Sequence, residues 1–86
     1  MLLEMNIAED EIGMKAIVGV VGNDSQAALT SVSITFDIFD KEGYKLDEAA
    51  DFIERLGPGE KWKFKAYISE DEMETAKLIE LSGYHE

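Results

Sequence analysis

The feature that most constrains this fold is a strict alternation between apolar and polar residues at 31–38. Its large apolar side chains all share one parity: Val32, Ile34, Phe36 and Ile38. Successive side chains of a β-strand point to opposite faces, so this spacing predicts a strand with one buried face. Asp40 and Gly43 follow it and predict a tight turn, because an aspartate can bond its own backbone and a glycine tolerates positive φ.

A second alternating run lies at 61–68. Trp62 and Phe64 share the parity of Ala66 and Ile68, and the opposite parity holds the other four residues: Lys61, Lys63, Lys65 and Tyr67. We expect Trp62 in the core, because a sugar-stacking tryptophan would lie on the outward parity. The only proline, in Gly57-Pro58-Gly59, predicts a turn immediately before this strand.

Shorter segments bounded by turn-forming residues complete the predicted strands: 2–8, 16–21, 44–46, 52–56 and 77–82. Gly19 inside one of them predicts a bulge or the close approach of another segment. The acidic passage 47–51 is short for a helix and is expected to be irregular or an edge segment. At 69–74 we expect an exposed connection, with one helical turn capped by Ser69 as an alternative. The fold class is therefore all-β, an antiparallel sandwich of about seven strands, with a small barrel as the alternative.

Length and composition limit the domain organisation. The 86 residues suffice for one core, so we expect a single β-sandwich domain over 1–86, which is also the size of a module excised from a longer chain. Cysteine is absent, which excludes disulfides and thiolate metal sites. The sequence contains neither an apolar run long enough to span a membrane nor the pattern of a signal peptide.

The charge balance narrows the classes of partner. A formal net charge of −11 repels phosphate backbones and anionic headgroups, so neither nucleic acid nor direct membrane insertion is expected. Another protein or a neighbouring domain is the expected partner, and the oligomeric state is left open. The lysines at 61, 63 and 65 are predicted to pair with acids across strands or to guard an outer face, and a docking patch for an acidic partner is the alternative.

Residues 19–64 resemble the FxLYD family. Phe36-Asp37-Ile38-Phe39-Asp40 is similar to its signature, with Ile38 and Phe39 where leucine and tyrosine are usual, and Gly43 completes a D-x-x-G turn. Two further passages are similar to the G-x-V-x-N-x-S and L-x-P-G-E-x-x-x-F elements of the family: Gly19 to Ser25, and Leu56 to Glu60 with Phe64. The resemblance implies an immunoglobulin-like β-sandwich, often one module of a bacterial or archaeal envelope or secreted protein. It implies no settled biochemical activity and no functional residues.

Candidates for chemistry are few. The only histidine, His85, lies one residue from the end and has no cysteine to act with, and the serines lack a nucleophile-elbow context: Ser25, Ser31, Ser33, Ser69 and Ser82. Carboxylates that could hold Ca²⁺ gather in three places: Glu9 to Glu11, Asp37 with Asp40 and Glu42, and Glu70 to Glu74. None of these has the spacing of an EF-hand loop.

We therefore assign no catalytic, cofactor-binding or metal-binding residues and expect no cofactor. The sequence favours a non-enzymatic structural or protein-interaction module, and the resemblance implies that it belongs to an envelope or secreted protein. A domain that binds a divalent cation through its acidic loops is the alternative.

Overall fold

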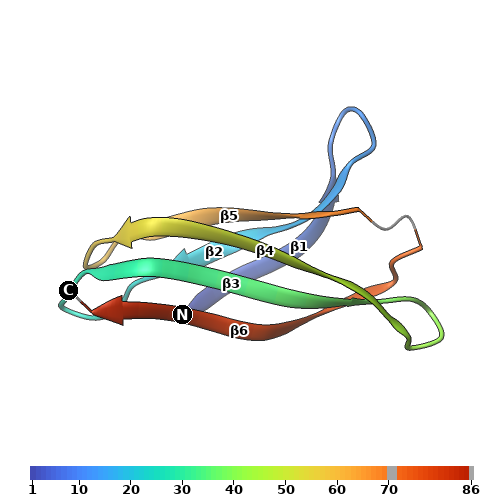
Figure 1. Ribbon diagram of the computed structural model, residues 1–86. Helices are drawn as coiled ribbons and strands as arrows, with labels where there is room; N and C mark the ends of the chain where they lie inside the picture. Colours follow the sequence, from blue (N-terminus) through green and yellow to red (C-terminus); the bar gives the residue numbers. More distant parts are fainter. Residues whose placement is uncertain (70–71, 86) are drawn as a thin grey trace.

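The computed structural model describes residues 1–69 and 72–85, which form two antiparallel sheets of three strands each (Figure 1). One sheet has the order β1–β2–β5, with the bounds Leu2–Glu9, Lys15–Gly22 and Lys61–Ile68. The other has the order β4–β3–β6, with the bounds Lys45–Leu56, Leu29–Phe39 and Thr75–His85. No helix occurs in the described residues, so the all-β prediction is confirmed.

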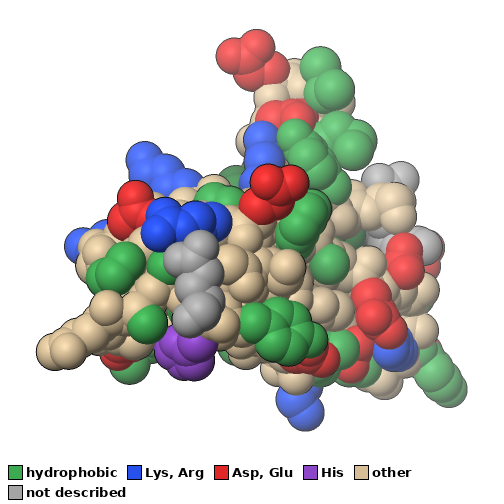
Figure 2. All heavy atoms as spheres, turned by 60° about the vertical axis from the view of Figure 1, so that its left-hand side comes forward, with side chains coloured by type: hydrophobic (Ala, Val, Ile, Leu, Met, Phe, Trp, Pro, Cys, Tyr) green, Lys and Arg blue, Asp and Glu red, His purple; other side chains and the backbone are tan. Residues whose placement is uncertain are grey.

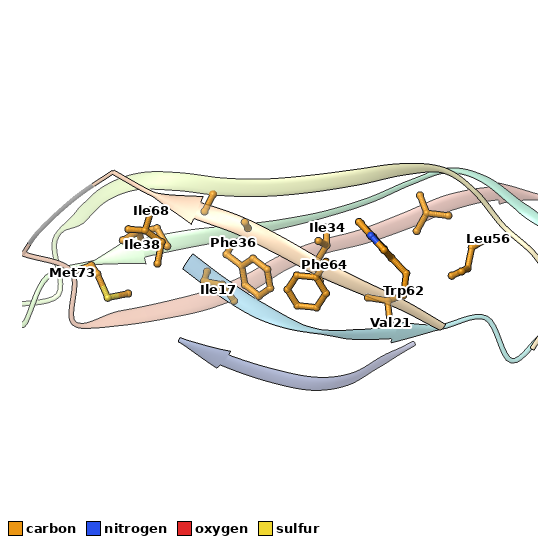
Figure 3. Packing of buried hydrophobic residues seen from close by; sticks show 13 residues of the cluster. Ile17, Val21, Ile34, Phe36, Ile38, Leu56, Trp62, Phe64, Ile68 and Met73 are labelled. Carbon is orange, nitrogen blue, oxygen red and sulfur yellow. The ribbon is translucent and has the colours of Figure 1, made fainter. Parts of the chain in front are cut away.

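The core lies between the two sheets and is built from both alternating runs. Phe36 of β3 stacks on Phe64 of β5, and Trp62 meets Phe64 edge to face, with its ring centroid 6.0 Å away (Figure 3). Phe36, Ile34 and Ile38 are fully buried, which confirms the parity read from the sequence. Burying a large apolar side chain stabilises a fold by about 1.5–3 kcal/mol before entropy is subtracted. The inward-facing side chains of β3 and β5 therefore hold the two sheets together.

The predicted count of about seven strands is wrong, because the structure has six in its described residues. The segments 44–46 and 52–56 and the acidic passage between them form one strand, β4. Ala49 of this passage lies in the core opposite Phe36. Asp51 faces β5, where its Oδ2 accepts the backbone N–H of Lys65 at 2.8 Å. Asp51 and Asp47 have partners in β5 and just after it, and Glu48 binds Lys45 of β4 itself, so an acidic sequence forms an edge strand.

Two hairpins of the chain use the same turn. Asp10 begins the β1–β2 turn and Asp40 the β3–β4 turn, and in each the Oδ1 of the aspartate accepts two backbone N–H groups at 2.9–3.1 Å. Gly13 and Gly43 take φ values of +85° and +90°, which a glycine adopts at little cost. The turn predicted at 40–43 is confirmed, and the turn at 57–60 closes with Gly59 at φ +75°.

Bulges change the parity of two strands. The register of β6 against β3 shifts between Thr35 and Phe36, so that Leu78 and Leu81 both pack against the core while Ile79 is 47% exposed. The shared parity of Ile79 and Leu81 in the sequence therefore does not give them a common face. In β3, the register shifts after Thr30, and exposed Ser31 has a φ of +51°, a region that non-glycine residues rarely adopt.

Gly19 confirms the predicted close approach of another segment. A Cβ added there would lie 2.0 Å from the backbone oxygen of Glu4 and 2.8 Å from Cζ of Phe64. Glu4 follows a bulge at the start of β1, which brings that oxygen over β2. Only a glycine lets β1 dock here.

Asn23 is the buried polar residue that ties the loops of one end together. Its Nδ2 donates to the carbonyl oxygens of Ala27 and Leu56 at 2.8 and 2.9 Å, and its Oδ1 accepts the N–H and Oγ–H of Ser25. Its backbone also exchanges hydrogen bonds with the turn at 57–60. With its donors and acceptors satisfied, this residue joins the β2–β3 loop to the end of β4.

Candidate functional site

The structure does not bring the candidate catalytic residues together. His85 is exposed at the end of β6, beside Leu29 in the register. The Ser25 hydroxyl is bound in the loop around Asn23, and the Ser33 and Ser82 hydroxyls lie 3.2 Å from each other. Ser69 donates to Asp47, and the alternative of a helical turn capped by Ser69 falls on residues 70–71, which lie outside the described residues.

The acidic loops use their carboxylates for the turns. Oδ1 of Asp10 and of Asp40 each bind backbone N–H groups, as described above. Across residues 1–69 and 72–85, no three histidine or acidic side chains are grouped closely enough to hold a metal ion. Glu70 and Asp71 of the third acidic cluster fall outside this range.

Ionic contacts gather on the outer face of the β4–β3–β6 sheet. Lys45 Nζ lies 2.9 Å from Glu48 Oε2 and 3.0 Å from Asp37 Oδ1, and the Asp37 side chain is only 17% exposed. Hydrogen bonds to Glu48 and then to Asp37 raise the pKa of Lys45 above its ordinary value. This cluster fixes the start of β4, beside an open hollow of about 410 Å³ lined by residues 45–48.

The lysine stripe of β5 lies on the outer face of the β1–β2–β5 sheet, as its parity predicts. Its cross-strand neighbours on β2 are Gly22, Val20 and Val18, and within the described residues none of its three lysines forms an ion pair. Of the two predicted roles, pairing with acids does not occur in the part of the chain that the structure describes, and the outward position of the stripe fits the other, guarding an outer face. Lys65 Nζ instead lies 5.1 Å from the centre of the Tyr67 ring.

The two long sides of the molecule differ in how the sheets meet. On one side β4 and β5 are in contact, and Asp51 and Asp47 bind Lys65 and Ser69 across the gap. We call this side the closed seam. On the other side β1 ends one sheet and β6 ends the other, and we call it the open seam.

Partly buried apolar side chains line the open seam. They extend the core cluster from β1 and β6: Leu2, Met5, Ala76, Leu78 and Leu81. At one end of the seam a groove of about 290 Å³ opens between Met1 and Val21 on one sheet and Val32, Leu81 and Gly83 on the other. The core is therefore less covered on this side.

The outer edge of β1 presents unpaired peptide groups at the open seam. The backbone N–H of Asp10 donates to the oxygen of Met14, and the register continues without interruption to Glu4 opposite Val20. In an antiparallel ladder hydrogen-bonded and non-hydrogen-bonded pairs alternate, so the peptide groups of Met5, Ile7 and Glu9 point away from β2. No described strand pairs with this edge. Sequence reasoning missed it, because the composition of β1 does not say on which side it has a neighbour.

The hairpin between β1 and β2 also projects from the layers, at the top of Figure 1. It carries Ile12, which is 84% exposed, and Met14, which is 41% exposed. Figure 2 shows hydrophobic side chains on this projection with acidic ones beside them. The hairpin lies at one end of β1, so it extends the same exposed surface.

Comparison with protein-family models, curated proteins and solved structures gave no significant match to this chain. Among the described residues, no helix has the length and apolar character needed to cross a membrane. The free edge of β1 is the candidate functional site that the geometry supports best.

Proposed function

We propose that this chain is a non-enzymatic protein-interaction module with an immunoglobulin-like sandwich topology, and that β1 binds a strand from another polypeptide. The observation that carries this is the edge of β1 from Glu4 to Glu9, which has no bulge and where the peptide groups of Met5, Ile7 and Glu9 have no partner strand among the described residues. An added strand would satisfy these groups, which is the basis of β-augmentation.

The lack of protecting features in the middle of this edge supports the proposal. Natural edge strands are commonly blunted by inward-facing charges, bulges, lysines or proline. On the closed seam, Asp47 and Asp51 face inward from β4. In β1 the bulge lies near the start, at Leu2–Glu4, and the charged Glu9 lies at the end. Between them the inward-facing residues are Met5 and Ile7, which are both apolar. The middle of β1 therefore has the features of a binding edge.

The resemblance to the FxLYD family is consistent with a non-catalytic role. Phe36 lies in the core, Asp40 and Gly43 form a turn, and Asn23 joins loops, so strand, turn and packing account for these motif positions. Location in a cell envelope or a secreted protein belongs to the same proposal. It rests on the resemblance alone.

The test compares two variants in capture of partners from the cells that make the protein. Ile7→Pro removes an outward N–H that β2 does not use, so β1 should stay paired while its edge is blocked. Lys63→Glu changes the outer face of β5 and is the matched control. A partner that is lost with Ile7→Pro and kept with Lys63→Glu supports the proposal. Equal capture by both variants would contradict it.

A further inference from the structure

The partner that the β1 edge fits best is a second copy of the same edge. We propose that two copies of this chain pair antiparallel through β1, about a two-fold axis at Asn6, so that their three-stranded sheets become one continuous sheet. This inference rests on the proposed function of β1 as a binding edge. It goes further by naming the partner and the register.

The peptide groups limit the registers that are possible. Those of Met5, Ile7 and Glu9 point outward, so a symmetric antiparallel ladder must pair odd-numbered residues with odd-numbered residues. With the axis at Asn6, Met5 of one copy exchanges hydrogen bonds with Ile7 of the other. The two Asn6 residues then form a pair without hydrogen bonds between their own peptide groups.

Charge and backbone geometry separate this register from its neighbours. With the axis at Ile7, Glu4 would stand opposite Asp10 of the second copy, and like charges directly opposite each other destabilise a sheet. With the axis at Met5, Ile7 would have to pair with Leu3, which lies at the bulge of β1. With the axis at Asn6, Glu4 stands opposite Ala8, and only the terminal pair, Glu9 opposite Leu3, reaches the bulge. No acid then faces an acid.

Apolar burial favours the same arrangement. Ile7 is 44% exposed, and Met5 is partly buried against the core. Both lie on the parity that faces the open seam, since they stand beside Ile17 and Gly19 of β2. Pairing Met5 with Ile7 of the second copy covers apolar surface that the monomer leaves in water.

The edge of β6, on the other sheet at the open seam, is less suited to such pairing. Its register against β3 shifts twice, between Thr30 and Ser33 and between Thr35 and Phe36. Bulges increase local twist and interrupt the row of outward peptide groups. From Glu4 to Glu9, β1 has no such interruption.

Net charge predicts how this association responds to salt. Two copies of charge −11 repel each other, and added salt screens that repulsion. Self-association should therefore strengthen as ionic strength rises. Capture of a basic peptide would weaken under the same change, so the salt response separates a second copy from a cationic partner.

Cysteine cross-linking tests the register, because the chain has no cysteine of its own. In an antiparallel pair without hydrogen bonds the Cα atoms are about 4.5 Å apart, within the range of a disulfide. At micromolar protein, Asn6→Cys should form a covalent dimer roughly tenfold or more faster than Lys63→Cys, since a complex raises the local thiol concentration towards millimolar. Adding Ile7→Pro to Asn6→Cys should remove this advantage, while the melting curve shows that the fold is kept.

Each outcome bears on the proposal. Faster oxidation of Met5→Cys or Ile7→Cys than of Asn6→Cys would overturn the axis at Asn6. Equal rates for Asn6→Cys and Lys63→Cys, together with a wild-type monomer in sedimentation at high salt, would overturn self-pairing. If Ile7→Pro still abolished capture of another protein in that case, the proposed function of β1 would stand without this inference.

Discussion

Phe36 of β3 and Phe64 of β5 face each other across the two sheets, with ring centroids 5.8 Å apart and ring planes inclined by 27°. The two rings come from the two alternating runs of the sequence and lie near the centre of the core (Figure 3). Their contact joins the sheets at mid-length. On the closed seam, side chains of β4 add hydrogen bonds to β5, while the open seam leaves the edge of β1 free.

Replacing Phe36 with alanine should lower the free energy of unfolding by about 3–5 kcal/mol, because Phe36 is fully buried and its ring leaves a cavity against Phe64. Phe52→Ala is the matched control, since Phe52 is 61% exposed on the outer face of β4. The control should change stability by less than about 0.5 kcal/mol. Urea titration of both variants decides the matter, and a loss below about 1 kcal/mol for Phe36→Ala would place this ring outside the effective core.

Asn23→Ala should destabilise the fold by about 1–3 kcal/mol, because the carbonyl oxygen of Leu56 then loses a donor in a buried place and that of Ala27 loses one in a partly buried place. Neighbouring Asp24 is exposed, so Asp24→Ala serves as the control. Thermal melting of the two variants measures the difference. Equal melting temperatures would show that water replaces the amide without cost.

Gly19→Ala should release β1 from the sheet, because the new Cβ would overlap the backbone oxygen of Glu4. Gly22→Ala in the same strand is milder, as its Cβ would meet the flexible tip of Leu3 at 3.0 Å. Hydrogen exchange should therefore speed up along β1 in the first variant and much less in the second. Unchanged protection of β1 in Gly19→Ala would mean that the sheet accommodates a side chain here.

The ion pairs of Lys45 should give a small pH-dependent contribution to stability. In the folded chain the pKa of Lys45 is raised above 10.5, first by the hydrogen bond to Glu48 and then by the one to Asp37. The folded state therefore favours the charged lysine, and this stabilisation is complete below pH 10.5 and is lost as the pH rises through the higher folded pKa. Lys45→Met should melt below wild type at neutral pH, and the gap should close at strongly alkaline pH and in high salt. A gap that stays constant with pH would assign the loss to packing.

Much of the fold could be predicted from local pattern, since alternation at 31–38 and 61–68 determines which side chains are buried. The pattern fails where the backbone departs from regular pleating. At Ile79 a bulge reverses the parity of β6. In the acidic passage, a hydrogen bond from Lys65 of β5 lets the Asp51 carboxylate face inward from β4. Both effects depend on a neighbour distant in sequence.

The candidate site could not be predicted for the same reason. The residues of β1 indicate a strand, but an edge becomes free or covered only when the sheet order is known. The lysine stripe depends on the register in the same way. Its charges predicted acidic neighbours across the strands, but the register places Val18 and Val20 opposite Lys65 and Lys63.

Residue-resolved amide exchange of dilute protein at low salt tests most directly whether β1 is a docked strand with a free outer edge. The register predicts slow exchange at Asn6 and Ala8, whose N–H groups bond to β2, and fast exchange at Met5 and Ile7, whose N–H groups point outward. Uniform protection from Met5 to Ala8 would show that the edge is covered, and uniformly fast exchange would show that β1 is not docked. Either result would contradict this account.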